Sequence, residues 1–124
     1  MNDDNKNIPI VYACSGCSNM AQVTHDIALS MHAAGSAEMS SISGIGGNVE
    51  AIIEKANTGR DIIAIDGCHH QCAKECLLQH GLKETHHFIL KDMRLKKTDD
   101  EPISLRESAK LLKTIHLACG LAKA

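Results

Sequence analysis

Aromatic residues are almost absent from this chain of 124 residues, which contains one Tyr, one Phe and no Trp. Such a chain lacks the ring surfaces on which proteins stack bases and sugars. An excess of positive charge is missing too, because the formal net charge is −2 and the most basic stretch, residues 91–97, is short and includes Asp92. Nucleic acid is therefore not an expected partner.

A long apolar segment is also missing. The N-terminal residues MNDDNKN are polar and acidic, whereas a secretory signal is basic and then apolar, and no uncharged apolar run approaches the length of a membrane span. We therefore expect a cytoplasmic protein that does not enter a membrane. In that reducing compartment, six cysteines serve as metal ligands, redox groups or small buried residues more often than as structural disulfides.

The length and the 44% hydrophobic content suit one domain with an aliphatic core. We expect residues 1–7 to form a disordered N-terminal tail and residues 8–124 to form a single α/β metal-binding domain. Short apolar runs predict strands, and longer stretches with apolar residues at intervals of three to four predict helices. The expected strands are residues 8–13, 37–42, 61–66 and 87–90, and the expected helices are residues 20–34, 48–56, 70–80 and 104–119.

This alternation predicts a Rossmann-like or flavodoxin-like fold of three layers, α/β/α. Short connections favour right-handed crossovers, and the third strand is apolar on both faces, so the four strands should form a parallel sheet in the order 2-1-3-4. Ser18 or Asn19 is the expected N-cap of the first helix, Ser104 that of the last, and Gly35 should end the first helix. Residues 91–102 should form a loop. A ligand is expected beyond the carboxyl ends of the first and third strands.

Two groups of cysteines follow those two strands. Cys14 and Cys17 form a C-x-x-C pair after the first strand, and Cys68, Cys72 and Cys76 follow the third. A C-x-x-C pair places two sulfurs on one turn, and a tetrahedral zinc site needs two such arms with Zn–S distances of about 2.3 Å. The fold should bring the two arms together. The alternative is that these residues are small buried thiols that fill loop corners.

Cys119 and Cys76 are expected to have structural roles. Cys119 shares the apolar face of the last helix with Leu112 and Ile115, which predicts a place in the core. Cys76 lies one turn after Cys72, so it is either a further thiol near the site or a residue packed against the sheet, and we favour packing.

Several polar and glycine residues near the strand ends have alternative interpretations. His69 and His70 are either ligands or exposed loop residues, and the pair His86–His87, at the amino end of the fourth strand, should be structural or exposed. Asp66 should cap the loop of Gly67 and Cys68 or bond a neighbouring backbone N–H group, rather than act as a general acid or base. The glycines of Gly44–Gly47 form either a tight turn or a loop whose N–H groups face an anion. No set of residues indicates catalysis, so we name no catalytic residue.

The motif Asp66-Gly67-Cys68, followed by Cys72-Ala73, resembles that of the DGC-domain family of cysteine-rich, zinc-binding proteins. Cys14-Ser15-Gly16 and Gly44-Ile45-Gly46-Gly47 are similar to further elements of the family's pattern, and the resemblance spans residues 8–92. It implies a cysteine-bound metal in a small α/β domain, with Cys14, Cys68 and Cys72 as ligands.

The fourth ligand is where this chain departs from the family. Many relatives have a cysteine just before the glycine-rich turn, where this chain has Ser41. Cys17 could supply the missing thiol, with Cys76 and His69 as alternatives. The expected metal set is therefore Cys14, Cys17, Cys68 and Cys72.

These features lead to three functional hypotheses. The first is a non-enzymatic protein that holds zinc, or another thiophilic metal or metalloid, in metal handling or as a structural site. The second is a thiol–disulfide oxidoreductase that uses Cys14 and Cys17, since that pair lies between a strand and a helix N-terminus. The third is an iron–sulfur protein. The sequence does not identify a protein partner.

Overall fold

The computed structural model describes residues 8–14, 19–93 and 103–121. Cys17 and Ser18 lie outside these ranges, as do the expected tail of residues 1–7 and most of the expected loop of residues 91–102. All statements that follow concern the described residues.

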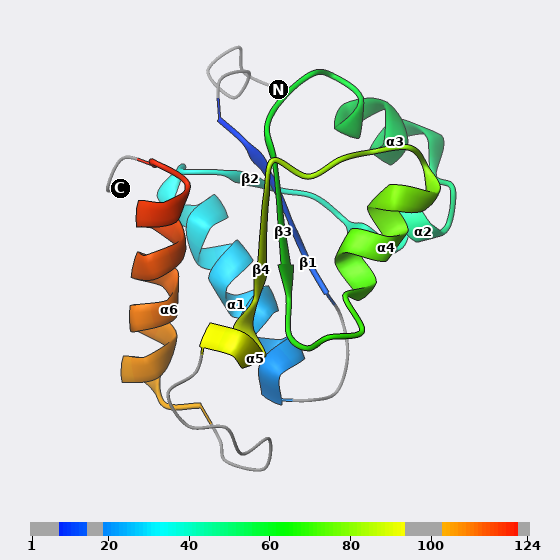
Figure 1. The fold of residues 1–124 in the computed structure, drawn as a ribbon. Helices are drawn as coiled ribbons and strands as arrows, with labels where there is room; N and C mark the ends of the chain where they lie inside the picture. Colours follow the sequence, from blue (N-terminus) through cyan, green and yellow to red (C-terminus); the bar gives the residue numbers. More distant parts are fainter. Residues whose placement is uncertain (1–7, 15–18, 94–102, 122–124) are drawn as a thin grey trace.

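The centre of the fold is a four-stranded parallel sheet in the order β2-β1-β3-β4 (Figure 1). The strands are β1, Ile10–Ala13; β2, Glu38–Met39; β3, Ile62–Asp66; and β4, His86–Ile89. Every residue of β1 and β3 is buried, as expected for central strands covered on both faces. The predicted α/β class and strand order are confirmed.

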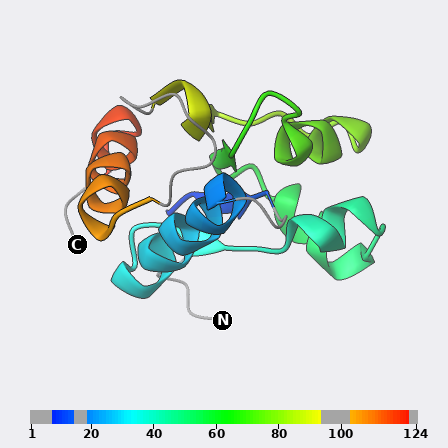
Figure 2. The same ribbon diagram turned by 90° about the horizontal axis from the view of Figure 1, so that it is seen from below.

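Helices cover both faces of the sheet (Figure 2). One face packs against α1, Asn19–Ala34; α5, Leu90–Met93; and α6, Leu105–Ala118. The other face packs against α2, Ile42–Gly46; α3, Glu50–Ala56; and α4, Cys72–Gln79. The chain thus passes from one face to the other between α1 and α2, which leaves the carboxyl ends of β1 and β2 between helices of opposite layers.

The side chains of β1 alternate between the two faces of the sheet, and this alternation determines which layer of helices the Cys14 side chain faces. Val11 and Ala13 join the core beneath α1 and α6, whereas Ile10, Tyr12 and Cys14 join the core beneath α2 and α4. Successive residues of a strand point to opposite faces, so this division follows from the period of two. Cys14 therefore projects toward the layer that contains α4.

The helix ends agree in part with the predicted caps. Ser104 caps α6, because its hydroxyl accepts a hydrogen bond from the Glu107 N–H at 3.1 Å. Gly35 ends α1 with a φ of +80°, a conformation that glycine adopts without strain. Asn19 is the first residue of α1 rather than its N-cap, and Ser18, the other expected N-cap, lies outside the described residues.

Two predicted boundaries need larger corrections. Residues 37–42 were expected as a strand, but β2 ends at Met39 and Ile42 begins α2, because Ser41 accepts a hydrogen bond from the Gly44 N–H and starts a helical turn. The expected fourth strand begins one residue earlier, and Leu90 lies in α5 instead, together with residues 91–93, which were predicted as the start of a loop. The other helices differ from the predicted ranges by a few residues at their ends.

Candidate metal centre

Cys14 lies directly after β1 and contacts the loop that follows β3. Its backbone N–H donates to the Ile65 carbonyl at 3.0 Å, which continues the pairing of β1 with β3. Its Sγ accepts a hydrogen bond from the Gly67 N–H at 3.3 Å, and the Thr24 hydroxyl lies 3.4 Å from the same sulfur. The Cys14 sulfur is thus hydrogen-bonded to Gly67, the residue immediately before Cys68.

This contact requires a glycine at position 67. A Cβ atom there would lie 3.0 Å from the Met20 Cβ and 3.1 Å from the Ala21 backbone nitrogen. Neither position can yield easily, because both belong to the first turns of α1. The glycine of the Asp66-Gly67-Cys68 motif therefore lets the loop after β3 approach α1 and Cys14.

The surroundings of Cys14 favour a neutral thiol. Burial raises the pKa of Cys14; hydrogen bonds with the Thr24 hydroxyl and from the Gly67 N–H lower it in part, and the nearby Asp66 and Cys72 raise it further. The Thr24 hydroxyl has a single proton and lies 2.6 Å from the Ala21 carbonyl and 3.0 Å from the Cys14 carbonyl. When the hydroxyl donates that proton to one of these carbonyls, its oxygen can accept a hydrogen bond from the Cys14 thiol.

The cysteines of the second group differ in exposure. Cys68 is half-buried and Cys72 is exposed at the first residue of α4. Cys76 is half-buried and packs against the core beneath α2 and α4, and a Cβ on Gly46 would lie 3.5 Å from its Sγ. This position fits the interpretation that Cys76 is packed.

Within the described ranges, no three Cys, His, Asp or Glu side chains are close enough to hold one metal ion. The structure brings Cys14 against the loop of Cys68 but does not show a complete set of ligands. Because Cys17 lies outside the described residues, the four-cysteine site stays a prediction.

Asp66 fixes the start of α4 and joins it to β4. Its carboxylate is 1% exposed and accepts hydrogen bonds from the N–H groups of Ala73 at 2.8 Å and Lys74 at 3.3 Å. The His87 Nε2 lies 2.7 Å from the same carboxylate. Asp66 therefore bonds backbone N–H groups, which is one of its two expected roles, at the start of α4 rather than in the loop of Gly67 and Cys68, and the sequence does not predict its pairing with His87. Only the sheet register brings these two residues together, so the sequence carries no local signal for the pair.

Other candidates from the sequence have structural partners. The His69 Nε2 lies 2.6 Å from the Asp92 Oδ1, and both side chains are exposed. Cys119 packs against the core beneath α6, and burial raises its pKa to about 11, which fits the predicted structural place.

The Gly44–Gly47 motif packs tightly rather than forming an open loop. A Cβ on Gly44 would lie 2.9 Å from the Ile52 Cγ1, and the Gly47 N–H is bonded to the Ser43 carbonyl. Together with the Gly44 N–H that binds Ser41, these contacts use the motif's backbone donors inside α2. The glycines thus allow α2 to lie against α3.

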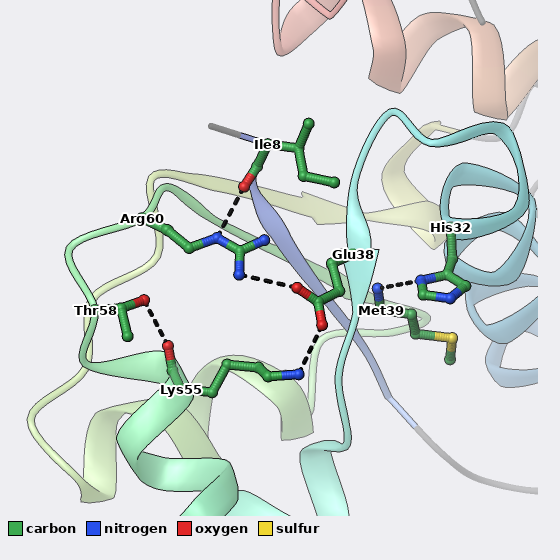
Figure 3. A network of polar contacts seen from close by, with 7 residues as sticks. All are labelled: Ile8, His32, Glu38, Met39, Lys55, Thr58 and Arg60. Atoms are coloured by element: carbon green, nitrogen blue, oxygen red, sulfur yellow. Dashed lines mark hydrogen bonds and ion pairs between the residues drawn. The ribbon is translucent and has the colours of Figure 1, made fainter. Parts of the chain in front are cut away.

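A second polar cluster lies at Glu38, the first residue of β2. Glu38 accepts a hydrogen bond from the Lys55 Nζ at 2.6 Å and another from the Arg60 Nη1 at 2.9 Å (Figure 3). The Arg60 Nε donates to the Ile8 carbonyl at 3.0 Å. These contacts tie α3 and the start of β3 to β2, and we call Glu38, Lys55 and Arg60 the ionic cluster.

An open cavity of about 860 Å³ lies between Cys14 and the ionic cluster. Its floor is the ends of β1 and β2, and its walls come from α1 on one side and from α2 and α3 on the other. The lining residues are Ala13, Cys14, Ala21, Gln22, His25, Asp26, Met39, Ser40, Ser41, Ile42, Ser43, Ile52 and Lys55. A ligand was expected beyond β1 and β3, whereas this cavity lies beside β1 and β2.

Fold and site together define a small α/β protein with cysteines at the carboxyl ends of adjacent parallel strands. The model of the DGC domain matches residues 10–115, and the chain belongs to this family. It is similar to the "Anaerobic and virulence modulator AnvM" of Pseudomonas aeruginosa, with 44% identity over 104 residues, which cover 84% of this chain and 79% of AnvM. No solved structure matches the chain. None of the described helices is long and apolar enough to cross a membrane.

Proposed function

We propose that this protein binds a thiophilic metal ion through Cys14, Cys17, Cys68 and Cys72, with zinc as the leading candidate. We also propose that the bound ion serves a regulatory task. The hydrogen bond from the Gly67 N–H to the Cys14 Sγ carries this proposal. It shows that the residues following β1 and β3 meet at a sulfur atom, as a site built from two arms requires. Backbone N–H groups that donate to a ligating sulfur also orient it and stabilise its negative charge.

The chemistry of the available donors fits a soft ion. Three of the four proposed ligands are described and follow the ends of two neighbouring strands, and thiolates prefer zinc and other thiophilic ions to hard cations such as magnesium. Cys14 is only 8% exposed and is one of the residues that line the cavity. A metal bound there would supply the positive charge that keeps clustered thiols ionised.

The same features argue against the oxidoreductase hypothesis. An attacking cysteine needs a lowered pKa and access to its partner disulfide. Burial instead raises the pKa of Cys14, and the neighbouring Asp66 and Cys72 raise it further. A neutral, largely buried Cys14 is a poor nucleophile at neutral pH, but it can lose its proton to a metal ion.

The regulatory part of the proposal comes from the relative. AnvM is described as an anaerobic and virulence modulator. For the present chain, we propose that binding and loss of the metal ion switch the protein between a metal-bound and a metal-free state. Since the ligands come from separate strand ends, loss of the ion would free the loops that contain them while the sheet stays paired.

The experiment compares two cysteine variants purified without air. Cys68→Ser removes a proposed ligand, and Cys119→Ser removes a half-buried thiol that packs against the core beneath α6. Elemental mass spectrometry should show that Cys68→Ser loses its bound metal and that Cys119→Ser retains it. Circular dichroism checks that both variants fold. Equal metal loss in both, or equal retention, would overturn the proposed site.

A further inference from the structure

The cavity beside Cys14 has the hydrogen-bond donors and the size of a binding site. We propose that it binds a small organic anion with a carboxylate or phosphate group, and that this group lies against Lys55. The inference does not depend on the metal, because it rests on the ionic cluster and on the cavity wall.

The charge balance of the ionic cluster is the first argument. Glu38 is the one described carboxylate that pairs with Lys55 and Arg60, so two positive charges share one negative charge. The side chains of Glu38 and Arg60 are each 9% exposed, and uncompensated charge is costly in such surroundings. An anion beside Lys55 would bring the net charge of the cluster to zero.

Unused hydrogen-bond donors in the cluster support the same conclusion. The Lys55 ammonium has three protons, and one is used on Glu38. Its side chain is 27% exposed and lines the cavity. Lys55 is therefore the member of the cluster that can reach a ligand.

The adjoining cavity wall is rich in hydroxyl groups. Ser40, Ser41 and Ser43 follow the end of β2, and the Ser41 and Ser43 hydroxyls lie 2.9 Å apart. Hydroxyl and ammonium donors are the groups that bind carboxylate and phosphate oxygens. The carboxylate of Asp26 lines the cavity from α1, so the anionic group belongs on the side of Lys55.

The size of the cavity indicates an organic molecule rather than a bare ion. A volume of about 860 Å³ lies within the range of small-molecule sites. Met39, Ile42 and Ile52 add an apolar surface to the lining, which a free inorganic ion would leave uncovered. A molecule that extends from Lys55 across this surface would also cover Cys14 and so limit access to its sulfur.

The test is a titration of the full chain followed by two-dimensional NMR, with inorganic phosphate and acetate as separate probes. Sodium chloride at matched ionic strength corrects for screening. We expect saturable shifts at residues 40–43 and at Lys55 with at least one probe, and the probe that binds more tightly identifies the anionic group. Lys55→Met should weaken binding by about tenfold or more, because a charge-assisted hydrogen bond is lost.

Two variants and one treatment keep the test decisive. Lys55→Arg retains the charge and should retain binding, while Lys113→Met, at an exposed position of α6, should bind as the native chain does. A chelator should not change the affinity. The proposal is overturned if neither probe shifts these residues beyond the chloride control, or if Lys55→Met, with an unchanged melting temperature, binds as the native chain does. Binding that vanishes with the chelator would place the anion on the metal and overturn it too.

Discussion

The two polar regions at the ends of β1 and β2 are built in opposite ways. The ionic cluster is held by full charges at distances of 2.6 and 2.9 Å, whereas Cys14 is held by two contacts to an uncharged sulfur, whose larger radius accounts for their distances of 3.3 and 3.4 Å. Charge-assisted bonds are short and strong, while a neutral thiol is a weak donor and acceptor. The difference suggests that the ionic cluster fixes the fold, and that the Cys14 region is preorganised yet free to take a ligand.

The largest expected effect is in the ionic cluster. Glu38→Gln leaves the charges of Lys55 and Arg60 without a counter-charge in a mostly buried place. Breaking a buried pair in this way should lower the free energy of unfolding by about 3 kcal/mol. Denaturant titration measures the change. The matched control Glu54→Gln, at an exposed position of the adjoining α3, should change stability by less than about 0.5 kcal/mol.

The pH dependence of the difference in unfolding free energy between the native chain and Glu38→Gln sharpens the test. Burial alone would raise the pKa of Glu38, but hydrogen bonds and charges from Lys55 and Arg60 outweigh it and hold the pKa below its ordinary value of 4.5. The contribution of Glu38 is therefore complete above pH 4.5 and is lost as the pH falls through the lower, folded-state pKa. The stability gap between native chain and Glu38→Gln should shrink on acidification. A constant gap would contradict the assigned role of the charge.

A smaller effect is expected where the loop after β3 meets Cys14. Gly67→Ala places a Cβ atom 3.0 Å from the Met20 Cβ and 3.1 Å from the Ala21 nitrogen, so α1 or the loop must move. Such overpacking should cost about 2 kcal/mol in the free energy of unfolding. Gly46→Ala is the matched control, because its Cβ would meet only the Cys76 Sγ at an ordinary 3.5 Å. Equal effects of both substitutions would show that the close approach at Gly67 is not required.

The smallest effect concerns the hydroxyl beside the sulfur. Thr24→Val keeps the shape of a fully buried side chain but removes its bonds to the Ala21 and Cys14 carbonyls. We expect a loss of about 1 kcal/mol in unfolding free energy. Thr114→Val, which removes an exposed bond to the Lys110 carbonyl, should cost less. If Thr24→Val is as mild as this control, the Thr24 hydroxyl does not position Cys14.

The sheet was predictable because its signals are local. Residues 62–65 form an unbroken apolar run between Asp61 and Asp66, and the alternation with helices limits the possible strand orders. The second strand was predicted too long because Ile42 looks like its continuation. Ser41 decides otherwise by capping α2, and a serine three residues before a glycine is a weak signal in a sequence.

The candidate site was predictable only where topology alone decides it. Cys14 and Gly67 follow neighbouring strands, so their meeting could be expected from the order 2-1-3-4. The pair of Asp66 with His87 depends on register, and the cavity depends on how α3 places Lys55 beside Glu38. Such long-range contacts arise from packing and leave no trace in residue spacing.

The central claim is that the two cysteine groups hold one metal ion. The direct measurement combines elemental mass spectrometry with thiol titration of the native chain, purified without air, before and after chelation. We predict about one zinc ion per chain and four thiols that react only after the chelator is added, as expected for a tetrahedral site. A metal-free chain whose thiols react equally with and without chelator would contradict the claim.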